Sequence, residues 1–149
     1  MNIKFVDAKP EHKEYLLQAN AEINQVNEVN HENSFSKNLD KDLFTKNPKF
    51  HCLVALDNKT PVGMILYSFM YWADDGQVMW ISQAHVKKEY RKKGVFLEMI
   101  HFLEKKHNDV KLMSCATGKP NKRMQQLLNY AGGKQMDLLF YYIRINKQK

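Results

Sequence analysis

The segment VKKEYRKKGVFLEMI, residues 86–100, decides how this sequence is interpreted. Five lysine and arginine residues crowd positions 87–93, and an apolar run follows Gly94 immediately. The apolar positions of residues 95–107 leave only a narrow polar stripe, which predicts a helix that is mostly buried. Such a helix begins with about four backbone N–H groups that have no internal partner, and its dipole adds partial positive charge there.

The entrance to this predicted helix lacks the residues that usually satisfy those N–H groups. A Ser, Thr, Asp or Asn cap and acidic side chains are the common solution. Here Arg91, Lys92, Lys93 and Gly94 lead into the helix. Because Gly94 has no Cβ, a ligand can approach the backbone closely. The pattern predicts a phosphate or pyrophosphate site; a solvated lysine patch beside an ordinary helix start is the alternative that the residues alone leave open.

Two common phosphate-binding motifs do not occur in this chain. Neither GxxxxGK[ST] nor GxGxxG is present. The basic loop has a single glycine and follows a strand of a predicted hairpin, whereas the glycine-rich loop of a nucleotide fold follows the first parallel strand. An anion site here is therefore of another type.

Composition indicates one globular domain over residues 1–149. Apolar residues make up 44% of the chain and charged residues 26%, an ordinary balance for a folded domain. No apolar stretch reaches the roughly 18 residues of a membrane span, and residues 1–10 lack the apolar centre of a secretory signal. We therefore expect a cytoplasmic protein without membrane contact. Cys52 and Cys115 lie in apolar runs and are expected to be buried thiols, and the histidine spacing supports no metal site.

The hydrophobic pattern predicts an α/β fold with one mixed, largely antiparallel sheet and helices on both of its faces. Turn residues at 57–61 and 73–76 join apolar runs, so these runs are expected to form antiparallel hairpins. The predicted strands are 3–7, 50–56, 62–72, 77–86, 111–116 and 136–145, and the predicted helices are 12–25, 37–46, 95–107 and 120–131.

These residues resemble a known family. A strand that ends at Val86, followed by Arg91-Lys-Lys-Gly94-Val-Phe96 and an apolar helix, is similar to the acetyl-coenzyme A signature [RQ]xxGx[GA] of the GNAT superfamily of N-acetyltransferases. Phe96 stands where glycine or alanine is usual. The predicted order of elements also resembles the GNAT fold, so the likeness extends over nearly the whole chain. In the last predicted helix, Asn121 and Gly132 keep the spacing of a second family pattern.

The resemblance implies transfer of an acetyl group from acetyl-coenzyme A to a primary amine by direct attack. The acceptor would be a small-molecule amine or the amine of a protein or peptide, and the sequence does not choose between them. The coenzyme would contact backbone groups of one strand, a pyrophosphate loop and one asparagine side chain in the first turn of the last predicted helix. This implies the binding residues Ala84, His85, Val86, Arg91, Lys92, Lys93, Gly94, Val95, Phe96 and Asn121.

The catalytic groups are not assigned by the resemblance. Leu128 stands where the family often has a tyrosine that protonates the departing thiolate, and Tyr130 is expected to point elsewhere. Strand alternation predicts that Trp80, Ser82 and Ala84 share the face of Val86, whereas His85 faces the other way as a packed histidine. Other candidates without an assigned role are the acceptor-loop residues Glu28, His31 and Glu32 and the strand residues Tyr67 and Tyr71.

Three functions remain open from the sequence. The formal net charge of +7 would suit a nucleic-acid-binding module, but the cations gather at one helix entrance and the aromatic residues lie in apolar strands, which favours an enzyme. Leu128 leaves open a degenerate domain that binds the coenzyme without transferring acetyl groups.

The sequence also leaves open whether the protein forms a homodimer. The last predicted strand has no hairpin partner, so another chain could cover that edge of the sheet.

Overall fold

A computed structural model describes residues 1–29 and 34–145. One five-stranded sheet has the order β1-β2-β3-β4-β5. Each of the first four strands pairs antiparallel with the next, and β5 pairs parallel with β4. The strands are β1 (Ile3–Asp7), β2 (His51–Asp57), β3 (Thr60–Trp72), β4 (Gly76–Val86) and β5 (Leu112–Cys115). The helices are α1 (Lys13–Val26), α2 (Phe35–Asn38), α3 (Val95–Lys106) and α4 (Lys122–Tyr130), with short turns η1 (Pro10–His12), η2 (Leu39–Leu43) and η3 (Lys88–Tyr90).

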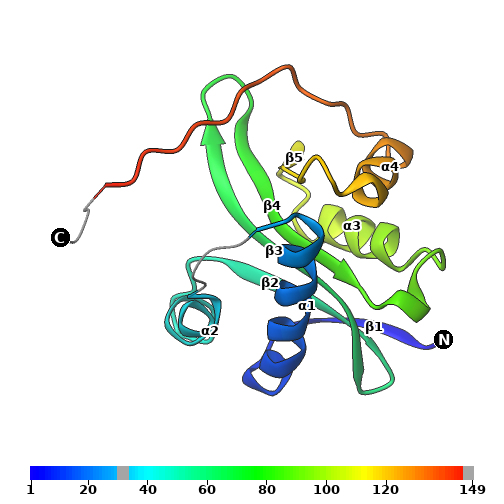
Figure 1. The fold of residues 1–149 in the computed structure, drawn as a ribbon. Coiled ribbons are helices and arrows are strands. Elements are labelled where there is room, and N and C mark those ends of the chain that lie inside the picture. Colours follow the sequence, from blue (N-terminus) through cyan, green and yellow to red (C-terminus); the bar gives the residue numbers. More distant parts are fainter. Residues whose placement is uncertain (30–33, 146–149) are drawn as a thin grey trace.

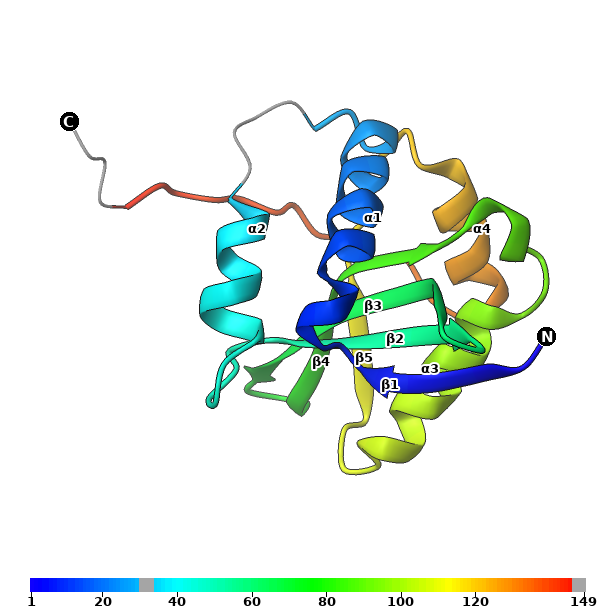
Figure 2. The ribbon, with the colours of Figure 1, turned by 90° about the horizontal axis from the view of Figure 1, so that it is seen from below.

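Helices cover both faces of the sheet. The ribbon shows α1 and α2 on one side, and α3 and α4 on the other (Figures 1 and 2). Two apolar clusters correspond to these layers. One joins α1 and η2 to β2 and β3 through residues such as Leu16, Leu39 and Val54. The other joins α3 to the sheet through residues such as Met99 and Leu103, so the predicted α/β architecture is confirmed.

The hairpin turns form where the sequence predicts them. Asn58, between β2 and β3, has a φ of 56°. Gly76, which follows the turn between β3 and β4, has a φ of +80°. Asparagine and glycine tolerate this left-handed region far better than other residues. The two tight turns explain why β2, β3 and β4 are neighbours along the chain and in the sheet.

A β-bulge at Ser82 changes the direction of the side chains in β4. Leu66 pairs with Gln83 but Tyr67 pairs with Ile81, so Ser82 has no partner residue in β3. A bulge inserts one residue and shifts the alternation from that point. Before it, Met79 and Ile81 face the α3 cluster; after it, Ala84 and Val86 do.

This bulge corrects one prediction made from strict alternation. Trp80 does not share the face of Val86, because the extra residue inverts the pattern between the two positions. Ser82 itself is exposed, and its hydroxyl donates to the Leu66 carbonyl at 3.3 Å. His85 faces α1, away from Val86, as predicted.

Residues 136–145 do not form the predicted strand. Residues 131–145 are exposed and without regular structure, and this part of the chain extends away from the domain (Figure 1). The composition favours a strand, but backbone N–H and C=O groups form a ladder only beside another strand. Within the described residues, no such neighbour lies next to this segment.

The remaining elements lie close to their predicted positions. The second predicted helix, 37–46, is displaced towards the N-terminus: α2 begins at Phe35, and the π-helical turn η2 ends at Leu43. Among the described residues, no helix is both long enough and apolar enough to span a bilayer.

Candidate functional site

The start of α3 has the open, uncapped form that the sequence predicts. Gly94 is the N-cap residue, with a φ of 81° and no side-chain hydrogen bond to the helix. The first helical bond there joins the Glu98 N–H to the Gly94 carbonyl at 3.0 Å, so the N–H groups before Glu98 lie ahead of the internal ladder. A Cβ added to Gly94 would meet no atom within 4 Å apart from its chain neighbours and the backbone of its own helix. The described chain therefore leaves space on the Cβ side of Gly94.

Positive charge surrounds this helix start. Lys92 and Lys93 are exposed, and the Lys93 ammonium lies 5.3 Å from the centre of the Tyr90 ring. Lys92 also adopts a φ of 61°, which is uncommon for a residue with a side chain. One acid, Glu98, lies in the first turn of α3. The loop nevertheless holds more cations than a helix N-terminus favours.

Three hydrogen bonds fix the basic loop to the sheet. The Arg91 Nε donates to the Val86 carbonyl at 2.8 Å, and the Lys87 N–H donates to the Val62 carbonyl at 2.8 Å. The Tyr90 hydroxyl donates to Asp57 Oδ2 at 2.9 Å. These bonds hold the loop at the end of β4, so Gly94 and the start of α3 have a defined place.

A cleft opens where β4 and β5 separate. Their parallel pairing ends at Ile81 and Cys115, whereas β4 continues to Val86. The cleft is lined by β4, by the chain after β5, and by parts of α1, α3 and α4, including Ile23, Gln83, Ala84, Phe96, Asn121 and Leu128. Beyond Ile81, the edge of β4 that faces the cleft pairs with no strand of the described chain. Its backbone groups are therefore available to a ligand.

One polar atom on the cleft wall lacks a partner. Gln83 Oε1 is buried and makes no hydrogen bond within the described part of the chain. A buried acceptor without a donor is unfavourable by about 1–3 kcal/mol. A ligand that brings an N–H or ammonium group into the cleft would remove this penalty.

Asn121 occupies the position that the resemblance implies, and it also has a structural role. Its side chain is the N-cap of α4, because Oδ1 accepts a hydrogen bond from the Met124 N–H at 3.2 Å. The residue is 8% exposed and lines the cleft. The side-chain amide nitrogen is the group that remains to serve a ligand.

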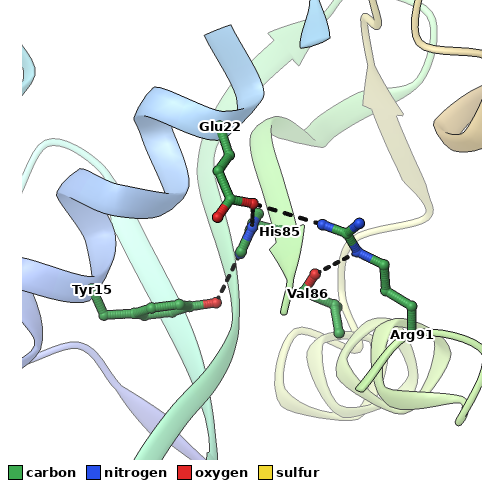
Figure 3. A network of polar contacts seen from close by, with 5 residues as sticks. All are labelled: Tyr15, Glu22, His85, Val86 and Arg91. Carbon is green, nitrogen blue, oxygen red and sulfur yellow. Dashed lines mark hydrogen bonds and ion pairs between the residues drawn. The ribbon is translucent and has the colours of Figure 1, made fainter. Parts of the chain in front are cut away.

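A polar network joins α1 to the end of β4 (Figure 3). The Tyr15 hydroxyl lies 3.0 Å from His85 Nδ1, and His85 Nε2 lies 2.6 Å from Glu22 Oε2. The same carboxylate oxygen lies 3.7 Å from Arg91 Nη2. The basic loop is thus connected, through Glu22, to a histidine that is only 7% exposed.

The electrostatics of this network favour a neutral His85. Burial lowers the pKa of His85, against the raising effect of Glu22. The hydrogen bond from His85 lowers the pKa of Glu22, which remains a carboxylate. Burial raises the pKa of Tyr15 well above its ordinary value, so its hydroxyl keeps the proton. In the tautomer that satisfies all three groups, Tyr15 donates to Nδ1 and Nε2–H donates to Glu22.

Three residues of this region, Tyr15, Glu22 and Arg123, were not among the sequence candidates for the site. Tyr15 and Glu22 are seven residues apart in α1 and so lie on one face of the helix, a signal that places Glu22 beside Tyr15. Arg123, near the start of α4, has its pKa lowered first by burial and then by Arg91. That interaction adds a second arginine near the loop, but no local pattern in the sequence predicts it.

The other candidates separate into core and surface residues. Phe96, at the family's glycine or alanine position, is 7% exposed, packs into the α3 cluster and also lines the cleft. Tyr67 is a core residue, whereas Tyr71 is 78% exposed. Tyr130 points away from the cleft, and Glu28 is exposed. His31 and Glu32 lie outside the described residues.

Known protein structures share this fold. A possible acetyltransferase from Clostridium difficile 630 aligns with a TM-score of 0.80 at 18% identity, covering 97% of this chain and 99% of that one. A ribosomal-protein-alanine N-acetyltransferase from Brucella melitensis biovar Abortus 2308 gives 0.75 at 15% identity, with coverages of 97% and 100%. The aminoglycoside N-acetyltransferase AAC(6')-Iy, solved with CoA, gives 0.75 at 13% identity, with coverages of 96% and 95%.

The sequence itself gives a more direct assignment. A search of curated proteins found no significant match. The sequence model of the acetyltransferase (GNAT) family, however, matches residues 15–132, which include most of α1, the sheet from β2 to β5, the basic loop and α4. The chain belongs to the GNAT family of acetyltransferases.

Proposed function

We propose that this protein is an acetyl-coenzyme A-dependent N-acetyltransferase that acts on a primary amine. The observation that carries the proposal is the uncapped start of α3 beside Gly94, together with Phe96 in the first turn of that helix, which lines the cleft where β4 and β5 separate. A helix N-terminus with free N–H groups and neighbouring cations suits a diphosphate. The cleft suits a narrow chain such as pantetheine, which carries amide donors for an acceptor like Gln83 Oε1.

Each predicted binding residue has a proposed task. The N–H groups of Val95 and Phe96 and the side chains of Lys92 and Lys93 would hold the diphosphate. Arg91 is tied to Val86, so we propose that its main task is to position the loop, with its outer nitrogens adding positive charge. Backbone groups of residues 84–86 and the Asn121 amide would align the pantetheine. The bound coenzyme supplies an acetyl thioester, which an unprotonated amine can attack directly.

The described residues do not supply a complete set of acid and base groups for the proton transfers of the reaction. Leu128 lines the cleft at the family's tyrosine position, so α4 provides no acid there for the departing thiolate. Arg91 and Arg123 favour a negative charge in this region, which would help the sulfur to leave as a thiolate. The carboxylate of Glu22 is 57% exposed in its side chain and faces the end of β4, where it would attract a cationic amine towards the site.

The acceptor and the cellular location are proposed only as classes. Proteins of this fold include an aminoglycoside acetyltransferase and a ribosomal-protein-alanine acetyltransferase, and these two names support a small-molecule amine or a protein amine. A cytoplasmic location is supported by the two cysteines, Cys52 and Cys115, which are both free thiols.

The direct test of transfer is release of coenzyme A thiol in the presence of amines. A panel of aminoglycosides, polyamines, amino acids and peptides with free N-termini is incubated with the protein and acetyl-coenzyme A. Thiol release that depends on one class of amine, with a matching acetylated product by mass spectrometry, is expected. The absence of release with every acceptor would contradict the enzymatic proposal.

A second candidate function is a domain that binds the coenzyme without transferring acetyl groups, favoured by Leu128 in the cleft. Thermal unfolding separates binding from transfer. At about a hundred times its dissociation constant, coenzyme A should add roughly 2.7 kcal/mol of stability, a rise of several degrees in Tm. A rise in Tm without thiol release supports the second candidate. A larger rise with duplex DNA than with coenzyme A would contradict both.

A further inference from the structure

The C-terminal end of α1 crosses the cleft between β4 and β5 on the side opposite α3 and α4. Ile23 and Asn27, one turn apart at this helix end, line the cleft together with residues of β4 and α4. Helices α1 and α3 lie on opposite faces of the sheet (Figure 2). The coenzyme proposed above would occupy the α3 side, where the diphosphate site lies. A second reactant therefore has to reach the cleft from the α1 side.

The first attachment of this helix end is to the β4 wall of the cleft. Glu22 Oε2 lies 2.6 Å from His85 Nε2 and 3.7 Å from Arg91 Nη2, as Figure 3 shows. Both contacts involve a carboxylate, and charge-assisted hydrogen bonds are stronger than neutral ones. This is therefore the firmer of the two attachments of the helix end.

The second attachment is to the chain between β5 and α4, on the opposite wall. The Gly118 N–H donates to Asn27 Oδ1 at 3.2 Å. The Gly118 carbonyl in turn accepts the Asn121 N–H at 3.0 Å and a hydrogen bond from Gln125 Nε2 at 3.1 Å. Gly118 thus links the end of α1 to the start of α4, where Asn121 lines the cleft.

The close approach of Asn27 requires a glycine at position 118. The φ angle of Gly118 lies outside the positive range that Gly76, Gly94 and Gly132 adopt, so its backbone would accept another residue. A Cβ added there, however, would lie 2.6 Å from Asn27 Oδ1 and 3.1 Å from Asn27 Cβ. The first distance is shorter than real Cβ contacts. The missing side chain is what lets the two walls meet on the α1 side.

We propose that Asn27 and Gly118 form a gate, which closes the α1 side of the cleft and has to open before an acceptor amine reaches the acetyl thioester. The inference rests on the proposed function, because it assigns the route of the second substrate. The gate is held by one neutral hydrogen bond, so it releases before the Glu22 attachment does. A wider amine requires a larger movement of the Asn27 end, so Asn27 is a specificity-determining residue.

Hydrogen exchange at the Gly118 amide measures the gate without any substrate. Because a single neutral bond protects this N–H, its protection factor should be on the order of ten. The amides in the middle of β3, which lie inside the sheet, should be protected far more strongly. Protection at Gly118 that equals the protection of the β3 amides would overturn the gate, because the contact would then open only when the domain unfolds.

A reversible disulfide tests whether the gate controls acetyl transfer. In the double variant Asn27→Cys/Gly118→Cys, the two Cβ atoms start 3.1 Å apart and need to separate only to the usual disulfide spacing of about 3.8 Å. Cys115→Ala is included, because that free thiol lies close to position 118 in the sequence. Diamide forms the disulfide and a phosphine breaks it. The matched control carries Asn27→Cys and Cys115→Ala alone.

Isothermal titration should give the same coenzyme A affinity for the oxidised and the reduced double variant. Thiol release with each amine of the panel that the reduced form accepts should fall on the order of tenfold or more on oxidation, and the control should not respond. Equal release rates in the two forms, or failure of the disulfide to form, would overturn the gate and leave the proposed function intact. Absence of coenzyme binding, or of release by the native protein with every amine, would overturn both.

Asn27→Ala tests the gate in the opposite direction and does not depend on the double variant. Loss of the hydrogen bond to Gly118 should raise kcat/KM for the amine several-fold, with the coenzyme A affinity unchanged. A lower kcat/KM would overturn the gate, because it would mean that the bond only holds the start of α4 in place.

Discussion

At the scale of single residues, Gly94 is the position on which the proposed coenzyme site depends most. Its left-handed backbone turns the chain into α3, and no described atom apart from its chain neighbours and the backbone of its own helix lies within 4 Å of the place where a Cβ would be. The residue therefore combines a conformational requirement with free space. A side chain there would change both the backbone preference and the room for a ligand, and the two effects need separate controls.

Gly94→Glu should abolish coenzyme A binding while the domain stays folded. The new carboxylate occupies the proposed diphosphate site and repels it, and the left-handed backbone adds about 1–2 kcal/mol of strain. Gly76→Glu is the matched control, since Gly76 has a φ of +80° and equally open surroundings but lies at the far hairpin. Isothermal titration should show binding to the control and none to Gly94→Glu. Equal affinities would contradict the assigned loop.

Tyr15→Phe should reduce the free energy of unfolding by about 1–3 kcal/mol, because it leaves His85 Nδ1 buried without its 3.0 Å partner. Tyr130→Phe removes an equivalent hydroxyl at an exposed position and should have almost no effect. Urea unfolding of the two variants measures the difference. Equal stabilities would mean that the Tyr15–His85 hydrogen bond in Figure 3 contributes nothing to the stability of the fold.

At the scale of elements, the site is produced by two interruptions of regular structure. The bulge at Ser82 reverses the faces of β4, and the early end of β5 at Cys115 opens the cleft. Neither feature can be predicted from the local sequence, because the position of a bulge or of a strand end depends on the neighbouring strand. The helix entrance at Gly94, by contrast, was predictable because the capping residues and charges that decide it are adjacent in the chain.

Asn121 allows the structural and the binding role of one helix cap to be separated. Asn121→Ala removes the cap of α4 and should destabilise the protein by about 1 kcal/mol, within the range of 0.5–2. Asn121→Asp keeps an oxygen for the Met124 N–H but loses the amide donors. It should therefore retain stability and bind coenzyme A more weakly. Unchanged affinity in Asn121→Asp would show that the residue only caps the helix.

At the scale of the whole molecule, the fold was largely predictable and the chemistry was not. Strands and helices between residues 3 and 131 follow from apolar periodicity and turn residues. The segment 136–145 has strong strand composition but no partner in the described chain, so its composition alone could not decide its structure. The contacts of Glu22 with His85 and Arg91 join α1 to β4 and to the basic loop. These residues are far apart in the sequence, so only the packing of the folded chain brings them together.

Stability should fall as the pH is lowered from 7.5 to 5. Burial lowers the pKa of four histidines in the folded protein, namely His12, His51, His85 and His107. Near pH 6.5 the unfolded chain binds protons that the folded chain does not, so acid favours unfolding. Urea unfolding across this range should give a smaller free energy of unfolding at the acid end, with a weaker pH dependence in His85→Gln. A rise in stability on acidification would contradict the neutral state of these buried histidines.

The central claim is that the main-chain N–H groups at the start of α3 bind the diphosphate of coenzyme A. The most direct measurement is a titration of the ¹⁵N-labelled protein with coenzyme A, followed through its amide resonances. Saturable shifts that are largest at Gly94, Val95, Phe96 and Leu97 are the predicted result. Binding that leaves these four amides unchanged, or no binding at concentrations that saturate known coenzyme A-dependent enzymes, would contradict it.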